Sequence, residues 1–546
     1  MNQPDELRRA EPLKWSTGTG TDVWDLFRAA MAGDTATIRS LLSRDPSLVR
    51  AHHAYRTPLY FAVRENRLEA AEYLLDQGAD PIGLAVNDSL LDICRDRGYP
   101  EMEAMLEARL ASLHRASPRG QAVARAIRAY DPAAAYNLLD ASPELIGIGD
   151  ERGNLPIHWA VMTRQLGVID ELLRRGADVN AVRQDGARPI QLVNGDYHFR
   201  GWRDVPGDVA TTPAQVLDHL RARGAYVDIN TAASIGDLDR VRELLDQDPS
   251  LANRTSEYVT YYIGSGAPLR NAAARGHIEV VKLLLERGAD PNLPEEGIAP
   301  HGHALYSAVY HGHHEIARLL LAHGAYPSPP VESSADALSI AISRNDAAMI
   351  DLLCSHGSHR SVELLAYYGD LRTAAAVFAA NPALADDPVA LENAIDQGHE
   401  AFVRLMLRYR PDLVRRVGAG VRSDRPLEPG KAQEFLEFLF AHGMDPSHRD
   451  WLGITPLHQF ARKGDVENAL IFLDHGADLN ARDEDICSTP LGWAAKFGQG
   501  SMVDLLLGRG APCNLPDDPP WATPLSWAVR RGRDAIAETL RRHGAR

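Results

Sequence analysis

The sequence lacks the features of several protein classes. Its 546 residues include 74 Asp and Glu against 58 Lys and Arg, a formal net charge of −16, so it has no basic excess for binding a phosphate backbone. No segment approaches the run of about 18 apolar residues that spans a membrane, and the N-terminus has no apolar run typical of a signal peptide. We therefore predict no nucleic-acid partner, no membrane segment and a cytoplasmic protein.

Paired cysteines and recognisable catalytic motifs are also missing. The chain has four cysteines, Cys94, Cys354, Cys487 and Cys513. They are far apart and include no C-x-x-C pair, so neither a disulfide framework nor a zinc knuckle is predicted. His314 and Glu315 fail the H-E-x-x-H zinc motif because Arg318 occupies its last position. G-x-S-x-G and phosphate-loop motifs are absent as well. The sequence therefore predicts no catalytic residues, no metal and no cofactor.

A helical segment ending in Gly, which is usually followed by Ala, recurs along the chain with a period near 33 residues. Gly324 and Gly357 are 33 residues apart, as are Gly443 and Gly476. In each segment, leucines three and four positions apart place one helix face in a core. The following Gly can adopt the left-handed conformation that closes a helix. The period predicts a chain of stacked helical units.

A start signal lies about half a period before many of these Gly-Ala ends. Thr can cap a helix N-terminus, Pro fits the first turn and Leu begins the buried stripe. The signal reads TPLYFAV from Thr57, LPIHWAV from Leu155, TPLHQFA from Thr455, TPLGWAA from Thr489 and TPLSWAV from Thr523. We therefore predict that each repeat contains two short helices, joined by a turn such as RGH at 275–277.

These motifs resemble the ankyrin-repeat family, whose unit of about 33 residues carries T-P-L-H-x-A. The resemblance runs from residue 22 to residue 546, and Thr455 to His458 match the signature fully. Tyr60, Gly492 and Ser526 replace its histidine, so those repeats must close their loops without that side chain's hydrogen bonds. The resemblance implies a curved all-α repeat solenoid with short β-hairpin fingers. Counting the repeat ends in this sequence gives about sixteen repeats, several of them degenerate.

A second repeat ending, DPxL or a close variant, divides the array into blocks. It begins at Asp45, Ser142, Asp248, Asn381 and, more loosely, Arg410. Here we expect the residue in the place of Gly to take the left-handed conformation, which Asp and Asn tolerate. We predict a leader over residues 1–21, which need not be ordered, and four ankyrin blocks with these bounds: 22–113, 121–230, 231–358 and 361–546.

The resemblance implies that a partner binds the fingers and the inner helices beside them. Exposed Trp and Tyr are favoured as interface anchors, so the aromatic and basic residues of the fingers and helix starts are candidates. They are Tyr55, Tyr258, Tyr261, Tyr262, Arg270, His301, Trp451 and Trp521. The alternative is that each finger simply packs on its neighbours.

An insertion, NGDYHFRGWRDVPGD at 194–208, lengthens the interval from Gly176 to Gly224 to 48 residues. A long loop on a repeat array often belongs to its binding face. It adds four candidates: Tyr197, His198, Arg200 and Trp202. The enlarged finger at 256–266 lies nearby in the chain, so the two loops could meet over the groove. The insertion could instead be a structural plug that covers a missing finger.

The leading hypothesis for function is a scaffold or adaptor that binds another protein on its concave finger and inner-helix face. The alternative is an enzyme or small-ligand receptor, with carbohydrate among its candidate ligands, whose pocket is formed by loops 194–208 and 256–266. The identity of the partner and the oligomeric state stay open at this point.

Overall fold

Helices joined by short turns make up the computed structural model of this chain. It describes residues 1–82, 88–183, 185–196, 198–256, 266–295, 299, 301–329, 331, 336–418, 420 and 430–546. Within these residues the only β-structure is isolated bridges, so the expected fingers are tight loops without regular strands. The chain forms two compact units, residues 6–359, and residues 360–546 together with residues 1–5.

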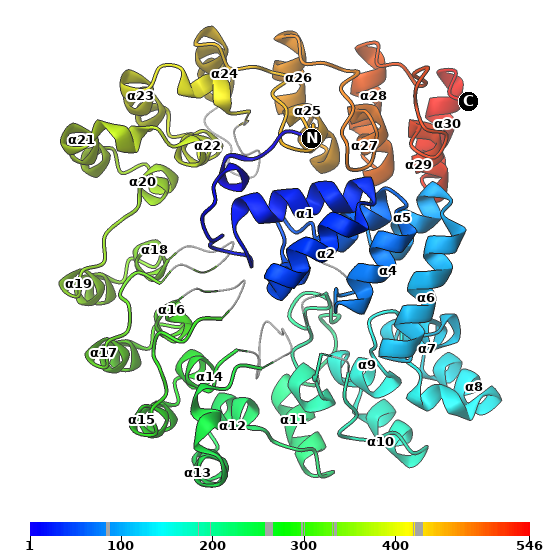
Figure 1. The fold of residues 1–546 in the computed structure, drawn as a ribbon, viewed down its shortest axis with the longest axis vertical. Helices are drawn as coiled ribbons and strands as arrows, with labels where there is room; N and C mark the ends of the chain where they lie inside the picture. Colours follow the sequence, from blue (N-terminus) through cyan, green and yellow to red (C-terminus); the bar gives the residue numbers. More distant parts are fainter. Residues whose placement is uncertain are drawn as a thin grey trace. The chain divides into compact units, whose positions relative to one another are not determined.

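Helix pairs build the unit of residues 6–359. The first helices of the pairs are α1 (Gly20–Ala32), α3 (Pro58–Arg64), α5 (Leu90–Arg97), α7 (Pro118–Arg128), α9 (Pro156–Met162), the 3-10 helix η4 (Pro189–Leu192), α12 (Ile229–Ile235), α14 (Pro268–Arg275), α16 (His303–Tyr310) and α18 (Ala337–Ser343). The second helices are α2 (Thr35–Arg44), α4 (Leu68–Asp76), α6 (Pro100–His114), α8 (Pro132–Ala141), α10 (Leu166–Arg174), α11 (Pro213–Arg221), α13 (Leu238–Gln247), α15 (Ile278–Glu286), α17 (His314–Ala322) and α19 (Ala347–Ser355). Figure 1 shows α14, α16 and α18 in one row and α15, α17 and α19 in a second.

The unit of residues 360–546 follows the same plan. Its first helices are α20 (Val362–Tyr368), α22 (Pro388–Asp396), α25 (Pro456–Lys463), α27 (Pro490–Phe497) and α29 (Pro524–Arg530). Its second helices are α21 (Leu371–Ala380), α23 (Glu400–Tyr409), α24 (Lys431–Ala441), α26 (Val466–Asp474), α28 (Gly500–Gly508) and α30 (Asp534–Arg542). Short 3-10 helices complete the described chain: η1 (Asp5–Arg8), η2 (Pro46–Arg50), η3 (Pro143–Gly147), η5 (Pro249–Asn253), η6 (Pro382–Ala385) and η7 (Leu413–Arg416). Each unit is an all-α repeat solenoid.

The predicted start and end signals are confirmed. The hydroxyls of Thr57, Thr489 and Thr523 accept the backbone N–H three residues later, and Pro follows each cap at the first helical position. At the ends of second helices, Gly78 and Gly288 have φ of 94° and 84°, the left-handed conformation expected there.

The expected left-handed conformation at the DPxL motifs is wrong. Asp45, Asp248 and Asn381 have φ of −141°, −145° and −142°, which is extended backbone. Each side chain instead accepts the backbone N–H two residues later, at 3.0 Å for Ser47 and Ser250. The following Pro then begins a 3-10 helix, so the motif is a cap that restarts the chain.

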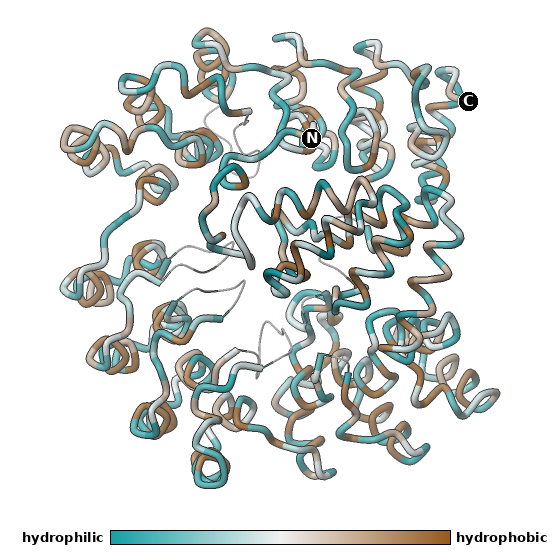
Figure 2. Tube along the Cα trace, viewed as in Figure 1, coloured by the Kyte–Doolittle hydropathy of each residue, from teal (hydrophilic) through white to brown (hydrophobic). Residues whose placement is uncertain are grey.

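The core of each unit lies between the two helix rows. In α12–α19, the side chains of Val241, Leu269, Leu284, Leu305 and Leu320 are at most 2% exposed and belong to one apolar cluster. Figure 2 shows hydrophobic positions recurring in each of these helices, while many of the connecting turns are hydrophilic. Burial of this stripe is the main favourable contribution to a repeat fold, because a single helix pair cannot bury its own apolar face.

Hydrogen bonds also tie several helix pairs to the pair before them. A side chain from the turn between two helices bonds a carbonyl at the end of the preceding pair's first helix. Four examples are Gln165 to Ile127, His277 to Ser234, His399 to Tyr367 and Gln499 to Arg462, at 2.8–3.0 Å. The bonded side chains leave no room for a side chain on the adjoining glycines, since a Cβ on Gly236 would lie 2.6 Å from His277 Nδ1.

The signature histidine links one finger to the next. In His158 and His458, Nδ1 accepts the backbone N–H of the capping residue, and Nε2 bonds Ala181 O and Ser488 O at 3.1 Å. Burial lowers the pKa of His458 to about 4, so the ring is neutral at pH 7. Where Gly492 replaces the histidine, the Ser488 hydroxyl donates to Ala522 O at 2.8 Å instead.

Candidate functional site

A buried ion pair anchors the insertion at 194–208. Arg183 Nη1 lies 2.9 Å from Asp196 Oδ2 and 2.7 Å from Asn154 Oδ1, and both members of the ion pair are less than 9% exposed. Asp196 also accepts the backbone N–H groups of His198 and Phe199 at 2.9 Å. Burial alone would raise the pKa of Asp196, but Arg183 and these hydrogen bonds hold it below its ordinary value. The carboxylate therefore stays ionised and fixes the base of the loop.

Aromatic packing fixes the rest of this base. Phe199 lies edge-on to Trp159 with ring centroids 5.3 Å apart, and the Arg128 guanidinium lies 4.7 Å from the Trp159 centroid. Arg164 Nη2 donates to Gly201 O at 2.8 Å. The next residue, Trp202, is 64% exposed. A rigidly held loop therefore presents a large aromatic side chain to solvent.

The other candidates of the insertion are less prominent. Arg200 is half-buried and its backbone N–H donates to Asp204 at 2.7 Å, whereas His198 is exposed. Tyr197 lies outside the described residues.

A pocket of about 190 Å³ lies beside the insertion, and His198 forms part of its wall. Ser89, Asp92, Glu151 and Arg152 supply further polar lining. Burial raises the pKa of Glu151, while partial burial and the Arg152 charge lower the pKa of His198 to about 4. Ligand sites typically enclose about 300–1,000 Å³, so this pocket is small for a sugar-sized ligand.

The finger at 256–266 is closed at its base. Ser256 N–H donates to Gly266 O at 3.0 Å, and Gly266 N–H donates to the Ser256 hydroxyl at 2.7 Å. Tyr258, Tyr261 and Tyr262 lie outside the described residues, so a meeting of the two loops stays a prediction.

A buried histidine–carboxylate pair lies against this base. His303 Nδ1 is 2.8 Å from Glu295 Oε2, and Ala267 N–H donates to the same carboxylate at 3.2 Å. Arg270 of α14 is half-buried, and burial lowers its pKa while the charge of Glu295 partly offsets that effect.

The remaining finger candidates lie in separate loops. Tyr55 is half-buried with φ of 63°, next to a bridge between His53 and Arg56. His301 is exposed, with its ring 5.7 Å from Tyr326. In the unit of residues 360–546, Trp451 and Trp521 are both half-buried, and the Trp521 ring packs edge-on to Trp527 at 6.0 Å.

A surface that our sequence reasoning missed lies at the C-terminal ends of α14, α16 and α18. Arg275, His311 and Arg344 end or cap these helices, and all three are exposed. Tyr310 is 45% exposed, and the Arg344 guanidinium lies 5.2 Å from its ring centroid. We call Arg275, Tyr310, His311 and Arg344 the cationic surface.

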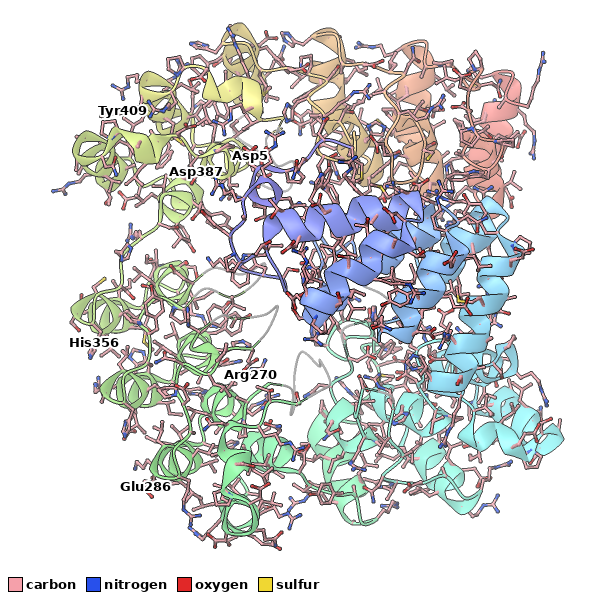
Figure 3. All side chains as sticks on the ribbon, viewed as in Figure 1. Asp5, Arg270, Glu286, His356, Asp387 and Tyr409 are labelled. Carbon is pink, nitrogen blue, oxygen red and sulfur yellow. The ribbon has the colours of Figure 1, made fainter. Side chains whose placement is uncertain are left out.

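The cationic surface belongs to the first-helix row. Figure 3 labels Arg270 on α14 of that row, and Glu286 and His356 at the ends of α15 and α19 in the second row. The sequence signal for this surface is a basic residue recurring at intervals of 36 and 33 residues, from 275 to 311 and then to 344.

Neither a membrane span nor a metal cluster occurs in the described parts of the chain. No helix there is both long and apolar enough to cross a bilayer. Likewise, no three His, Cys, Asp or Glu side chains among those residues converge in a way that could hold a metal ion.

Two family models match this sequence. The model "Ankyrin repeats (3 copies)" matches residues 229–330, 269–363 and 428–517, and the model "Ankyrin repeat" matches residues 55–87 and 152–184, together more than half of the chain.

Curated relatives match over short stretches. The E3 ubiquitin-protein ligase XB3 of Oryza sativa subsp. japonica is 45% identical over 65 residues, 12% of this chain and 13% of that protein. The ligase XBAT32 of Arabidopsis thaliana is 44% identical over 63 residues, 12% and 11% of the two chains. Alpha-latrocrustotoxin-Lt1a of Latrodectus tredecimguttatus is 27% identical over 165 residues, which are 30% of this chain and 8% of that protein. The chain thus covers between 8% and 13% of the length of these relatives.

Proposed function

This chain belongs to the ankyrin-repeat family, and from that premise we propose that it is a scaffold or adaptor that binds a partner protein through its finger loops and first helices. Ankyrin repeats mediate binding to other proteins. A repeat array suits this role because each pair contributes one finger and one first helix to a continuous surface.

The observation that carries the proposal is the exposed Trp202 on an anchored loop. The base of the insertion is held by the Arg183–Asp196 pair and by Phe199, while Trp202 itself is 64% exposed. A rigid loop loses little conformational entropy on binding, and Trp is enriched among residues that dominate interface energies. Such a side chain fits an anchor for a partner protein.

An enzyme or small-ligand receptor is the second candidate. The observation in its favour is the buried His303–Glu295 pair at the base of the finger at 256–266. However, Glu295 also accepts Ala267 N–H, which gives the pair a structural role in closing that finger. The pocket beside the insertion is smaller than typical ligand sites, so we rank a binding surface above a reaction site.

A cytoplasmic location is part of the proposal. All four cysteines are free, and burial raises the pKa of the Cys94 thiol to about 12. Free thiols suit a reducing compartment.

Quantitative affinity purification from cells tests the proposal. The wild type is compared with Trp202→Ala and with Leu113→Ala, a control that removes an apolar side chain 40% exposed on α6. We expect at least one partner protein to be lost with Trp202→Ala and kept with Leu113→Ala. Binding measured with the purified partner should then be weaker for Trp202→Ala than for Leu113→Ala. Identical partner sets for all three forms would contradict this role of the insertion.

A further inference from the structure

We propose that the cationic surface of α14, α16 and α18 binds an extended acidic segment of a partner protein with an acidic residue at about every third position. This inference rests on the proposed function, and it adds the chemistry of the segment that is bound. Arg275 and Arg344, both exposed residues, lie at the two sides of the surface, and Tyr310 and His311 lie between them on α16.

The surface is positively charged in a chain whose net charge is −16. Among the residues that the structure describes, the charged groups that act on His311 are Arg275, His313, Arg344 and Arg270, which are all basic. Partial burial and these groups lower the pKa of His311 to about 4, so its ring is a neutral hydrogen-bonding group at pH 7.

Aromatic stacking holds part of this surface in place. The Tyr306 and Tyr310 rings stack with centroids 6.1 Å apart, and the His311 and His313 rings stack at the same distance. Arg344 reaches back over Tyr310 from the next repeat. The guanidinium is therefore positioned before a ligand arrives, and arginine is well suited to binding a carboxylate through two parallel hydrogen bonds.

Repeat geometry sets the spacing of the acidic residues. Packed helices lie about 8–10 Å apart, so successive first helices present their ends at that interval. An extended polyproline II segment rises about 3.1 Å per residue with three residues per turn, which brings every third side chain to one face about 9 Å apart. Carboxylates three positions apart would thus meet α14, α16 and α18 in turn.

A protein segment fits this surface better than a nucleic acid. Few cations are involved, and a long polyanion would extend beyond them onto a chain with strong negative charge. A short acidic segment gains the local attraction and avoids most of that repulsion.

Fluorescence anisotropy with the full chain tests the proposal. The probe is a labelled peptide of Glu-Pro-Ala triplets, and the control peptide has the same composition with its glutamates in one block. The test variant is Arg275→Glu with Arg344→Glu. The matched control, Lys282→Glu with Arg318→Glu, makes the same change of charge at exposed positions of the second helices α15 and α17.

We expect the triplet peptide to bind more tightly than the block peptide. The test variant should lower its affinity about tenfold or more because two charge-assisted contacts become repulsive, whereas the control variant should change it by less than about threefold. Binding should also raise the pKa of His311, followed by NMR, because a carboxylate near the ring favours its protonated form. Should the double variant fail to fold, the single substitution Arg344→Gln provides the same comparison.

Equal losses in the two variants, equal binding of the two peptides, or tighter binding of single-stranded poly(dT) would each overturn the proposal. If neither peptide binds while Trp202→Ala still loses a partner, the acidic-segment inference fails and the scaffold function stands. If the triplet peptide binds as expected but no cellular partner depends on Trp202, the role of the insertion fails instead.

Discussion

The ends of the first helices carry cations in both units, but with opposite exposure. In α27 and α29, Lys496 Nζ lies 3.9 Å from the centroid of Trp527, and the two side chains are 4% and 1% exposed. In α16 and α18, Arg344 lies 5.2 Å from the centroid of Tyr310, and both side chains are exposed. The ends of the first helices thus support two different arrangements of a cation over an aromatic ring.

The difference shows that the burial of the neighbouring aromatic ring determines whether the cation is buried or exposed. Trp527 fills the core between helix pairs, so Lys496 is covered with it and contributes to packing. Tyr310 lies at the rim of its pair, so Arg344 stays in contact with solvent and available to a partner. We therefore expect substitutions in α27–α29 to change stability and substitutions in α16–α18 to change binding.

The largest contrast should come from removing the two aromatic rings. Trp527→Ala should reduce the local stability of α27–α30 by about 3–5 kcal/mol, since it leaves a large cavity. Tyr310→Ala should lower that of α16–α19 by only about 1 kcal/mol, because its ring is 45% exposed and its main loss is the stacking on Tyr306. Hydrogen exchange followed by mass spectrometry measures each region separately. Similar losses of stability in both regions would contradict the proposed difference between the two rings.

Acidification should act in opposite directions on the two regions. Burial and the nearby Asp485 raise the pKa of Asp483, in the finger before α27, to about 6 from an ordinary 3.8. The folded form therefore holds this proton more tightly than the unfolded form, and stability falls as pH rises from about 4 to about 6, by up to about 2–3 kcal/mol.

Glu295, in the finger before α16, has the reverse dependence. Burial would raise its pKa, but His303 and Arg270 outweigh that effect and lower it. Its contribution is present above the ordinary pKa of 4.5 and is lost as pH falls through the lowered value. Exchange protection at several pH values, corrected for intrinsic rates, measures both slopes. Asp483→Asn should remove the pH dependence of stability in the region of α27 and leave the pH dependence in the region of α16 unchanged.

The turn glycines offer a smaller test of the same contrast. Gly276 and Gly498 have φ of 77° and 79°, so alanine costs about 1–2 kcal/mol at either position. A Cβ at Gly276 would also lie 2.8 Å from the stacked His313 ring, whereas at Gly498 it would meet the flexible end of Arg533. We expect Gly276→Ala to cost about 1 kcal/mol more, because a ring yields less readily than an arginine side chain. Gly288→Ala, with no atom within 4 Å of its Cβ, is the control for backbone strain alone.

The smallest effects should come from the cations themselves. Lys496→Met should lower the local stability of α27–α30 by about 1 kcal/mol, since a desolvated cation over Trp contributes more than an exposed one. Arg344→Met should leave the stability of α16–α19 within about 0.5 kcal/mol while it weakens binding of the triplet peptide. A stability loss at Arg344 equal to that at Lys496 would show that both cations serve packing.

The helices could be predicted from the sequence because their signals are local. Thr57, Thr489 and Thr523 cap the helices that they were expected to start. Capping and Gly closure depend on residues within one turn, so a single sequence displays them. The family matches confirm the resulting fold class, whereas the number of repeats stays a prediction.

Features that depend on neighbouring repeats could not be predicted. The Asp45 side chain prefers an available backbone N–H to a left-handed backbone, which the motif alone does not reveal. Lys496 and Arg344 have similar positions in their repeats, and their exposure is set by rings on other helices. The functions assigned to Trp202 and the other finger residues therefore remain proposals, whereas their local surroundings are now defined.

The hydrogen bonds between successive helix pairs have a direction. The carbonyls of Ile127, Ser234, Tyr367 and Arg462 each receive a side chain from the pair that follows in the chain. On the ribosome, an emerging pair would therefore lack one partner until its successor had left the exit tunnel. Removing a pair from the C-terminal side of one of these bonds strands a carbonyl, whereas removing the pair on its N-terminal side leaves only an exposed side chain. These tandem repeats thus have a polarity, and synthesis from the N-terminus leaves such a carbonyl without its partner until the next pair has emerged.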